Sequence, residues 1–577
     1  MNKQAIFHQP KSNYCYAYNK DTIHIRLRAA KGDLDSVILV YGDKYDWANN
    51  RESSMEITYS DKLFDYFTVS IKAPNNRLSY YFILKKGNET GYYTEIGFFE
   101  NLDNEDIYIH FFNYPYVNEG DIHTVPEWVK DAVFYQIFPE RFSNGDKSND
   151  TCVTEEWGSL PKSDSFFGGD LRGIIDNIDH IVDLGINAIY LNPVFESDSN
   201  HKYDTTDYYK IDPHFGDLET MKELVDKCHS KGIKVIFDAV FNHSGYNFKP
   251  FQHVLENGDK SHYYNWFHIN KLPIEIEPPS YETFAFTHKM PKFNVSNDEV
   301  KEYLLGVAKY WIKEVGIDGW RLDVADEVEH DFWRDFRKVV KKANKDAYIV
   351  GEIWHDSLPW LMGDQFDGIM NYPVTRVCLK YFAQNSIKDI DFMESIDNAF
   401  IKNTYQVNEV MLNLLDSHDT PRFLTECNGN YKKLLLAISF LMTYIGAPCI
   451  YYGTEIGLEG GKDPDCRRTM IWDRSKWNND IYSSIKKLIS LRREHEALRR
   501  GKFKWLKDLN GVLGYTRESD NEKVLVLINN SNQTKNVNLI EYFNECVDLL
   551  NSKKVVSKEG KMDIIMAEYS YKIFSVL

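Results

Sequence analysis

From about residue 126 onward, the sequence alternates apolar runs of strand length with amphipathic stretches of helical length. This alternation is typical of βα units that build a parallel sheet, and eight such units are the number that closes a (β/α)8 barrel. We therefore predict a TIM barrel. The eight predicted strands are AVFYQIF near 132, AIYLNPV near 188, KVIFDAV near 234, GWRLDV at 319, AYIVGEI near 347, GIMNY near 368, VMLNLLD near 410 and APCIYYG near 447.

The chain on either side of the predicted barrel has a different texture. Alternating strands such as TIHIRLRA and LSYYFILKKG are separated by Gly and Asn turns near the N-terminus, and strand-like runs return near the C-terminus. At 577 residues the chain is also too long for one core. A long segment between the third and fourth barrel strands suggests an inserted domain. We predict an N-terminal β-sandwich over 1–122, the barrel over 123–503 with the inserted domain at about 242–296, and a C-terminal β-sandwich over 504–577.

The overall charge limits the kinds of partner. Sixty-eight lysines and arginines stand against 86 aspartates and glutamates, giving a net charge of −18, and no basic patch offsets it. Nucleic acids and anionic membranes are therefore poor candidate partners. The eight cysteines form no CxxC pairs, the N-terminus lacks an apolar leader core, and no segment approaches about 20 consecutive apolar residues. We expect a soluble cytoplasmic protein with reduced thiols.

Charged and imidazole side chains interrupt the apolar runs where the predicted strands end. In a barrel these C-terminal strand ends meet at one mouth, where barrel enzymes have their active sites. A single aspartate at a strand end is more often a helix cap, but carboxylates on four different strands are hard to explain that way. The residues concerned are Asp238, His243, Arg321, Asp323, Glu352, His418 and Asp419.

Clustered carboxylates without a catalytic cysteine or a nucleotide-binding loop favour glycoside hydrolysis, in which one carboxylate attacks and another donates a proton. Arg321 precedes Asp323 by two residues on the same strand face, so its charge can keep the aspartate ionised as a nucleophile. Glu352, on the next strand, would begin protonated, donate to the leaving oxygen and then act as base toward water. A retaining mechanism would need these two carboxyl groups about 5–5.5 Å apart.

Taken in order, these segments resemble the short sequence motifs of the α-amylase family of glycoside hydrolases (family 13). The resemblance is greatest to the neopullulanase, cyclomaltodextrinase and maltogenic amylase branch, because MPKFN at 290–294 is similar to a marker of that branch. It extends over essentially the whole chain and includes an N-terminal module of the starch-binding type. Further matching segments are YQIFPERF at 135–142, FFGGDLRGI at 166–174, YYGTEIGLEGG at 451–461 and DPDCRRTMIW at 463–472.

The resemblance implies a role for each matching residue. Asp323 would be the nucleophile, Glu352 the acid and base, and Asp419 a third carboxylate that stabilises the distorted sugar. The chain departs from the family pattern at Phe293 and Thr454, where leucine and an acidic residue are commoner. The implied sugar-binding residues are Arg321, His243 and His418 at the cleavage point, Tyr203 beneath the sugar, Trp354 and Phe284 as aromatic platforms, and Asp463 and Arg467 on the donor side.

The loop NGDKSND at 144–150 gathers oxygen ligands of the kind that calcium prefers. On composition alone, a solvated turn rich in Asn and Asp explains the loop better. The resemblance adds a calcium loop completed by the neighbouring GGD segment, so we expect a structural calcium ion and no organic cofactor. A zinc site is not expected, since His243 and His418 lack a third ligand at a suitable spacing. The expected calcium ligands are Asn144, Asp146, Asn149, Asp150, Gly168 and Asp170.

The resulting prediction is a retaining α-glucan hydrolase that cleaves α-1,4 bonds of cyclodextrins, pullulan and maltooligosaccharides to maltose or panose through a covalent glycosyl-enzyme intermediate. The resemblance also implies a homodimer formed through the N-terminal module. Two alternatives stay open. One is an α-glucanotransferase that passes the same intermediate to a sugar, and it shares every catalytic residue with the hydrolase. The other is an inactive binding or scaffold homologue, which the presence of all three carboxylates disfavours.

Overall fold

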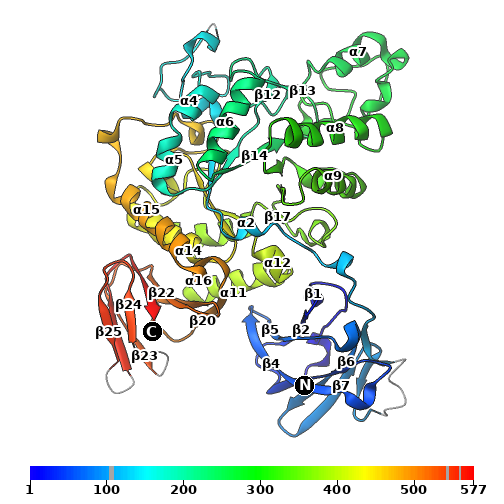
Figure 1. Ribbon diagram of the computed structural model, residues 1–577, viewed down its shortest axis with the longest axis vertical. Coiled ribbons are helices and arrows are strands. Elements are labelled where there is room, and N and C mark those ends of the chain that lie inside the picture. Colours follow the sequence, from blue (N-terminus) through cyan, green and yellow to red (C-terminus); the bar gives the residue numbers. More distant parts are fainter. Residues whose placement is uncertain (103–109, 152, 541–544, 558–560) are drawn as a thin grey trace. The chain divides into compact units, whose positions relative to one another are not determined.

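The computed structural model describes residues 1–102, 110–151, 153–540, 545–557 and 561–577 (Figure 1). These residues form two compact units, each of which is described by itself. The first comprises Met1–Thr124, Leu358–Gly363 and Ile387–Asn408, and the second comprises Val125–Ser357, Asp364–Ser386 and Glu409–Leu577. Within the described ranges, every helix is too short or too polar to span a bilayer.

The first unit is an antiparallel β-structure around its own apolar core. Its strands are β1 (Cys15–Asn19), β2 (Thr22–Ala30), β3 (Ser36–Gly42), β4 (Arg51–Ser60), β5 (Phe64–Ile71), β6 (Leu78–Lys86), β7 (Glu89–Thr94), β8 (Gly97–Phe99) and β9 (Phe112–Tyr114). They are hydrogen-bonded in the order β1-β2-β5-β4-β3-β6-β7-β8, with β9 paired to β6. Alternation places Ile23, Ile25 and Leu27 of β2 in the core, as the period of a strand requires.

Two helices from between the sixth and seventh barrel strands also belong to the first unit, α11 (Asp389–Ile401) and α12 (Tyr405–Asn408). Tyr59 stacks on Phe400 of α11 with ring centroids 4.9 Å apart. The buried Arg26 donates to the backbone carbonyl of Ile401, where a cation is favoured because the helix C-terminus carries partial negative charge. Helix α11 therefore shares buried and charged contacts with the β-structure.

The second unit is built on eight parallel strands, which confirms the predicted barrel. Each predicted run contains one strand: β10 (Phe134–Ile137), β11 (Ala188–Leu191), β14 (Lys234–Ala239), β15 (Gly319–Leu322), β16 (Tyr348–Gly351), β17 (Gly368–Ile369), β18 (Leu412–Leu414) and β19 (Ala447–Tyr451). Their order is β17-β16-β15-β14-β11-β10-β19-β18, and a parallel bridge between Met370 and Leu412 closes the ring.

Several of the helices that alternate with these strands begin at side-chain caps. The side chain of Asp217 accepts a hydrogen bond from the backbone N–H of Thr220 at the start of α6 (Leu218–Ser230). The side chain of Asn297 caps the start of α8 (Asp298–Glu314) in the same way. The main helices, most of which are labelled in Figure 1, are α4 (Leu171–Asp176), α5 (Ile178–Leu184), α6 (Leu218–Ser230), α8 (Asp298–Glu314), α9 (His330–Ala343), α10 (Tyr372–Cys378), α14 (Tyr431–Thr443), α15 (Asn479–Glu494) and α16 (Glu496–Arg500).

The interior of the barrel is packed with side chains. Inward-facing residues from successive strands, among them Phe134, Tyr190 and Tyr348, form one buried cluster. Toward the C-terminal strand ends the interior becomes polar, and Asp238 and Arg321 are wholly buried there. A buried charge is costly unless it is paired, so this end of the barrel must contain compensating partners.

The aromatic side chains of the segment between β14 and α8 pack against one another. It contains helix α7 (Lys249–Asn257), three short 3-10 helices and several isolated bridges. Phe251 meets the rings of Phe267 and Tyr281 at 4.9 Å each, and Phe293 stacks on Phe267 at 5.6 Å. Phe293, where the family pattern has leucine more often, is therefore part of a small aromatic core.

The C-terminal part of the second unit is a pair of antiparallel sheets. Its strands are β20 (Lys502–Leu506), β21 (Leu513–Glu518), β22 (Lys523–Asn529), β23 (Lys535–Ile540), β24 (Glu545–Asp548), β25 (Lys554–Val556), β26 (Lys561–Met566) and β27 (Ser570–Val576). Six of them form one sheet in the order β20-β21-β22-β27-β24-β25, and β23 pairs with β26. Leu527 and Phe574 of the larger sheet share a core with Val537 and Ile564 of the smaller, as expected for a sandwich.

Candidate active site

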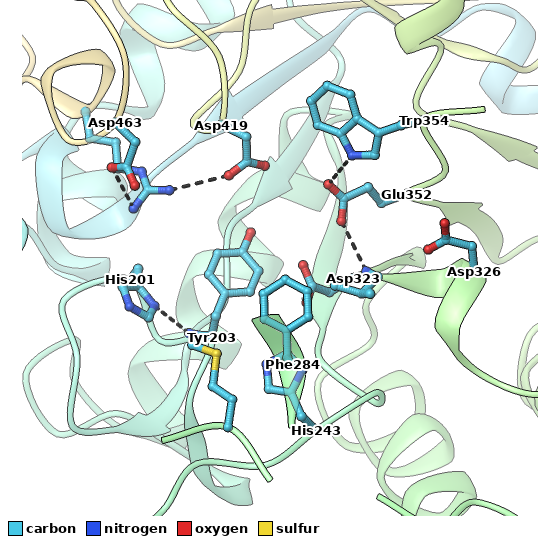
Figure 2. A pocket seen from close by; sticks show the side chains of 13 residues that line it. His201, Tyr203, His243, Phe284, Asp323, Asp326, Glu352, Trp354, Asp419 and Asp463 are labelled. Carbon is cyan, nitrogen blue, oxygen red and sulfur yellow. Dashed lines mark hydrogen bonds and ion pairs between the residues drawn. The ribbon is translucent and has the colours of Figure 1, made fainter. Parts of the chain in front are cut away.

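A pocket of about 440 Å³ lies at the C-terminal ends of the barrel strands (Figure 2). Its volume is within the range of small-molecule sites. Two residues predicted to bind sugar, Arg321 and His418, are fully buried behind its wall. The structure brings the other nine predicted catalytic and sugar-binding residues to the lining: Tyr203, His243, Phe284, Asp323, Glu352, Trp354, Asp419, Asp463 and Arg467.

The parallel strand ladder places the two carboxyl groups proposed for catalysis. Asp323 follows β15 directly, and its backbone N–H donates to the carbonyl of Ala239 at 3.0 Å. Glu352 follows β16 directly, and its N–H donates to the carbonyl of Leu322 at 2.9 Å. Because neighbouring parallel strands end at the same edge, the side chains of Asp323 and Glu352 enter the pocket side by side.

Arg321 is the cation that joins these carboxylates. Its Nη1 donates to Asp238 Oδ1 at 2.8 Å and to Asp323 Oδ1 at 2.9 Å, and its Nη2 lies 2.8 Å from Glu352 Oε2 without hydrogen-bond alignment. Strand pairing sets Asp238 directly opposite Arg321. This geometry explains why an arginine and an aspartate share one face of an apolar strand: the buried charges of several strands compensate one another.

Two donors hold the carboxyl group of Glu352. The indole Nε1 of Trp354 donates to Oε1 at 3.0 Å and the backbone N–H of Val324 to Oε2 at 3.1 Å, as Figure 2 shows. Val324 has a left-handed backbone, with φ 44°, which is rare for a β-branched residue. Strained backbone persists where the surrounding structure fixes it, and here it aims an N–H at the predicted acid.

Burial dominates the protonation of the cluster. It raises the pKa of Asp323 well above its usual range, against the opposing effect of Arg321 and with the support of Glu352. It also raises the pKa of Asp419 to about 7, with Glu352 as the next largest cause. Burial therefore favours the neutral form of Asp323 and Asp419, while the guanidinium groups of Arg321 and Arg467 favour their ionised form.

His418 and Tyr203 form a neutral hydrogen-bonded pair, in which Tyr203 lines the pocket and His418 lies behind it. Gln136 Nε2 donates to His418 Nδ1 at 2.9 Å, so the ring proton is assigned to Nε2, 2.6 Å from the Tyr203 hydroxyl. That hydroxyl donates in turn to Asp238 Oδ2 at 2.8 Å. Burial, followed by the charge of Arg467, holds the pKa of His418 well below its usual range, which keeps the imidazole uncharged.

His243 presents an unused donor to the pocket. Burial lowers its pKa to about 3, so the ring is neutral, and its Nδ1 lies 3.3 Å from the amide nitrogen of Asn242. Its Nε2 is buried and has no hydrogen-bond partner in the described structure. Phe284 stacks on this imidazole at 5.1 Å and 13°. A sugar hydroxyl is the kind of group that would satisfy Nε2.

Arg467 contacts two carboxylates and one backbone carbonyl at the Asp463 end of the pocket. Its Nη1 lies 3.1 Å from Asp463 Oδ1 and its Nη2 3.4 Å from Asp419 Oδ1. Its Nε donates to the backbone carbonyl of His418 at 2.9 Å. Figure 2 shows Asp463 and Trp354 on opposite sides of the pocket, with Asp419 between them. The predicted donor-side contacts thus lie together at one end.

Four lining residues were not predicted from the sequence: His201, Met290, Val324 and Asp326. His201 is adjacent to the predicted Tyr203, and Met290 opens the MPKFN marker, so proximity to those signals could have found them. Val324 and Asp326 belong to a short turn after β15 whose path no periodicity reveals. Asp326 Oδ2 lies 2.8 Å from Nε2 of His355, on the Glu352 side of the pocket.

The predicted calcium loop fits a cation in part. Asn144 Oδ1 and Asn149 Oδ1 are buried without a hydrogen-bond partner in the described structure, and Asn144 Nδ2 donates to Asp150 Oδ1 at 2.8 Å. The side chain of Asp146 instead accepts from Ser148, and that of Asp170 accepts backbone N–H groups at Gly145, Asp146 and Gly173. Among described residues, no group of three or more His, Cys, Asp or Glu side chains could hold a metal. The available oxygens are therefore mainly amides, with Asp150 and the backbone at Gly168 beside them.

Comparison with known proteins agrees with this geometry. Residues 136–541 match the family model "Alpha amylase, catalytic domain", and residues 1–118 match "Alpha amylase, N-terminal ig-like domain". A cyclomaltodextrinase of Geobacillus thermopakistaniensis is 47% identical over 586 residues, covering 100% of both chains. The intracellular maltogenic amylase of Bacillus subtilis is 43% identical over 551 residues, covering 94% of this chain and 93% of that one. A solved structure of a cyclomaltodextrinase matches 100% of both chains with a TM-score of 0.96 and 46% identity. The chain therefore belongs to the α-amylase family of glycoside hydrolases, in the branch of the cyclomaltodextrinases, maltogenic amylases and neopullulanases.

Proposed function

We propose that this glycosidase hydrolyses the α-1,4-glucosidic bonds of cyclodextrins, pullulan and maltooligosaccharides to maltose or panose, with retention of anomeric configuration. The observation that carries the proposal is the placement of Asp323 and Glu352 beside one buried guanidinium at the wall of a pocket. Contact of both carboxyl groups with one guanidinium, at the ends of neighbouring strands, supports the close placement that a retaining mechanism requires. The names of the relatives support the substrate class.

In the first step, an Asp323 oxygen forms a bond to the anomeric carbon while the bond from that carbon to the glycosidic oxygen breaks. The proton of Glu352 passes to the leaving oxygen. In the second step, water attacks the anomeric carbon, its proton returns to Glu352, and the bond to Asp323 breaks. Positive charge develops on the sugar in both transition states, so ionised Asp323 and Asp419 stabilise the transition states more than the bound substrate.

The neutral imidazoles serve binding rather than proton transfer. His243 and His418 both have pKa values that burial lowers below the usual range; the free ring nitrogen of His243 can bind a sugar hydroxyl, whereas His418 uses its ring proton on the Tyr203 hydroxyl. Trp354 presents an indole that is 38% exposed and stacked on Tyr372 at 3.5 Å between centroids, a platform on which a sugar ring can pack.

The proposal is tested by analysing products after separate incubation with β-cyclodextrin, pullulan and soluble starch. We expect maltose from the ring and panose from pullulan, both absent with Asp323→Asn, and initial products with the α configuration by proton NMR. An intact ring with randomly cut starch would refute the substrate proposal and leave the catalytic assignment standing. Initial products of inverted configuration would refute Asp323 as a nucleophile. Longer oligosaccharides growing at high maltose concentration would indicate glucanotransferase activity.

We also propose a structural calcium ion at the loop of residues 144–150. The two buried amide oxygens without a partner support it, together with Asp150. The ion would contribute no reaction chemistry. A chelator should lower Tm by several degrees, and calcium but not magnesium should restore it. An Asn144→Ala/Asn149→Ala variant should show no such response, and a wild-type Tm indifferent to chelator would end the proposal.

We propose a homodimer formed through the N-terminal module, on the strength of the family resemblance, and a cytoplasmic location, which the name of the Bacillus subtilis relative supports. Light scattering at micromolar concentration should give twice the 67.6 kDa mass of the chain. A mass of one chain would exclude the dimer, and recovery of the activity in the culture medium would exclude the location.

A further inference from the structure

The loop that carries two pocket residues contains a left-handed lysine. It connects β12 (Phe195–Ser197) to β13 (Thr205–Ile211), which pair as an antiparallel hairpin. Lys202 lies between His201 and Tyr203, both of which line the pocket. The φ angle of Lys202 is 65°, a region that glycine adopts freely and lysine seldom does. A lysine at such a position indicates that its side chain makes contacts that glycine could not make.

That side chain is wholly buried. Lys202 is 1% exposed, and its ammonium lies 2.8 Å from Asp212 Oδ2, 3.3 Å from the carbonyl of Ser197, and over the rings of Phe166 and Phe215 at 5.7 and 5.2 Å. Asp212 is also 1% exposed, and its Oδ2 accepts the backbone N–H of Ser197 at 3.0 Å. The ion pair therefore connects the end of β12, the loop and the residue after β13 without contact with water.

Further hydrogen bonds fix the backbone on both sides of Lys202. Its N–H donates to Ser199 Oγ at 3.1 Å, and its carbonyl accepts from Thr205 Oγ1 at 3.3 Å. The next N–H, that of Tyr203, donates to His201 Nδ1 at 3.1 Å, as drawn in Figure 2. With the ammonium and the backbone both anchored, the directions of the His201 and Tyr203 side chains follow from the conformation at Lys202.

Tyr203 is the point at which this loop reaches the catalytic charges. Its hydroxyl contacts Asp238 and His418, and its ring is stacked on the His418 imidazole at 5.4 Å and 3°. Asp238 in turn shares the Arg321 guanidinium with Asp323. A change of direction at Tyr203 would therefore disturb both the surface against which the sugar packs and the hydrogen bonding of the carboxylate opposite Arg321.

We propose that Lys202 is a positioning residue for glycoside cleavage: its buried ammonium, held by Asp212, fixes the left-handed turn that presents Tyr203 and His201 to the sugar being cleaved. The inference rests on the proposed hydrolysis of cyclodextrins. A purely structural ion pair would also be buried and costly to break, so stability alone cannot distinguish the two roles. A positioning role predicts a fall in kcat with little change in KM, because the geometry matters most in the transition state.

The test compares Lys202→Met, Asp212→Asn and the double variant with wild type, using kcat and KM for β-cyclodextrin measured well below the lowest Tm. Methionine keeps the length of the stem and removes the charge, and the double variant leaves no buried charge unpaired. Lys341→Met is the matched control, because it breaks a 2.8 Å pair with the buried Asp367 at the opposite, N-terminal end of the strands. If Lys202→Met does not fold, the double variant alone carries the test.

We expect Lys202→Met to lower kcat about 10²-fold, a loss typical of a misplaced reacting group, with KM changed less than about threefold. The double variant should regain Tm relative to Lys202→Met but keep the low kcat, whereas Lys341→Met should lose Tm and keep kcat within about twofold. Recovery of kcat together with Tm in the double variant, or a wild-type kcat in Lys202→Met, would overturn the inference. Absence of ring hydrolysis by wild type would instead overturn the proposed function.

Discussion

The protonation of Asp419 predicts that removing this carboxylate stabilises the enzyme at alkaline pH. Burial, then the proximity of Glu352, raises its pKa from 3.8 to about 7. The folded state therefore binds the proton more tightly than the unfolded chain does. The stability that this proton contributes is fully present below about pH 4 and is lost as pH rises through about 7. Asp419→Asn, which cannot ionise, should escape that loss.

The magnitude follows from the difference between the two pKa values. A difference of about three pH units at 1.36 kcal/mol each corresponds to about 4 kcal/mol. The side chain is 29% exposed and lies 3.4 Å from the guanidinium of Arg467, so solvent screening reduces the expected value to about 1–2 kcal/mol. More than a third of this loss has already occurred at pH 5, because the unfolded chain releases its proton near pH 4, so the gain of Asp419→Asn over wild type should grow by about 1 kcal/mol between pH 5 and pH 8.5.

The assay is Tm by differential scanning fluorimetry from pH 5 to 8.5, at constant ionic strength, for wild type and Asp419→Asn. A gain of about 1 kcal/mol corresponds to an added Tm difference of about 1 °C at the alkaline end, because the entropy of unfolding grows with the 577-residue length of the chain. Asp463→Asn is the matched control, because it removes a half-exposed carboxylate from the same arginine. If the Tm curves of Asp419→Asn and wild type run parallel over the whole range, the argument from burial is refuted.

Three further predictions follow from single contacts. Asp323→Asn should lower kcat on β-cyclodextrin about 10⁴-fold, and a loss of less than tenfold would contradict its role as nucleophile. Asp238→Asn should cost about 3–5 kcal/mol, because it takes a partner from a buried guanidinium; an unchanged denaturation midpoint would show that the other carboxylates suffice. Gly173→Ala places a Cβ 1.9 Å from the carbonyl oxygen of Ser143 and should cost about 3 kcal/mol or more by the same assay. Gly120→Ala, with nothing within 4 Å of the added atom, should be near neutral, and equal effects of the two alanines would refute the steric argument.

The sequence best predicts the positions of residues that lie in a strand or follow one directly. All eight barrel strands lie within the predicted runs, and the parallel order fixes which strand ends meet. Asp323 and Glu352 each follow a strand directly, so topology alone brings them together. Arg321 and His418, predicted to bind the sugar, lie at the same end of the barrel but behind the lining, because the sequence does not reveal which side chains the neighbours cover.

The residues that were missed belong to turns whose path depends on tertiary contacts. Val324 and Lys202 both adopt left-handed backbone, and neither is a residue type for which that conformation would be predicted. Asp326 reaches the pocket only because the turn after β15 folds toward the Glu352 side. For Asp146 and Asp170, the sequence showed oxygen ligands, whereas their side chains are used by backbone donors that only the folded loop supplies.

The place of helix α11 in the first unit has a consequence for how the chain is made. Residues 1–124 are synthesised 263 residues before residue 387, the start of the last segment of that unit. At about 5–20 residues per second, this interval lasts about 13–53 s. During that time Tyr59 lacks its stacking partner Phe400, and Arg26 lacks the helix end to which it donates. Although its strands are contiguous in sequence, the N-terminal module thus becomes complete only late in translation, after about two-thirds of the chain has been synthesised.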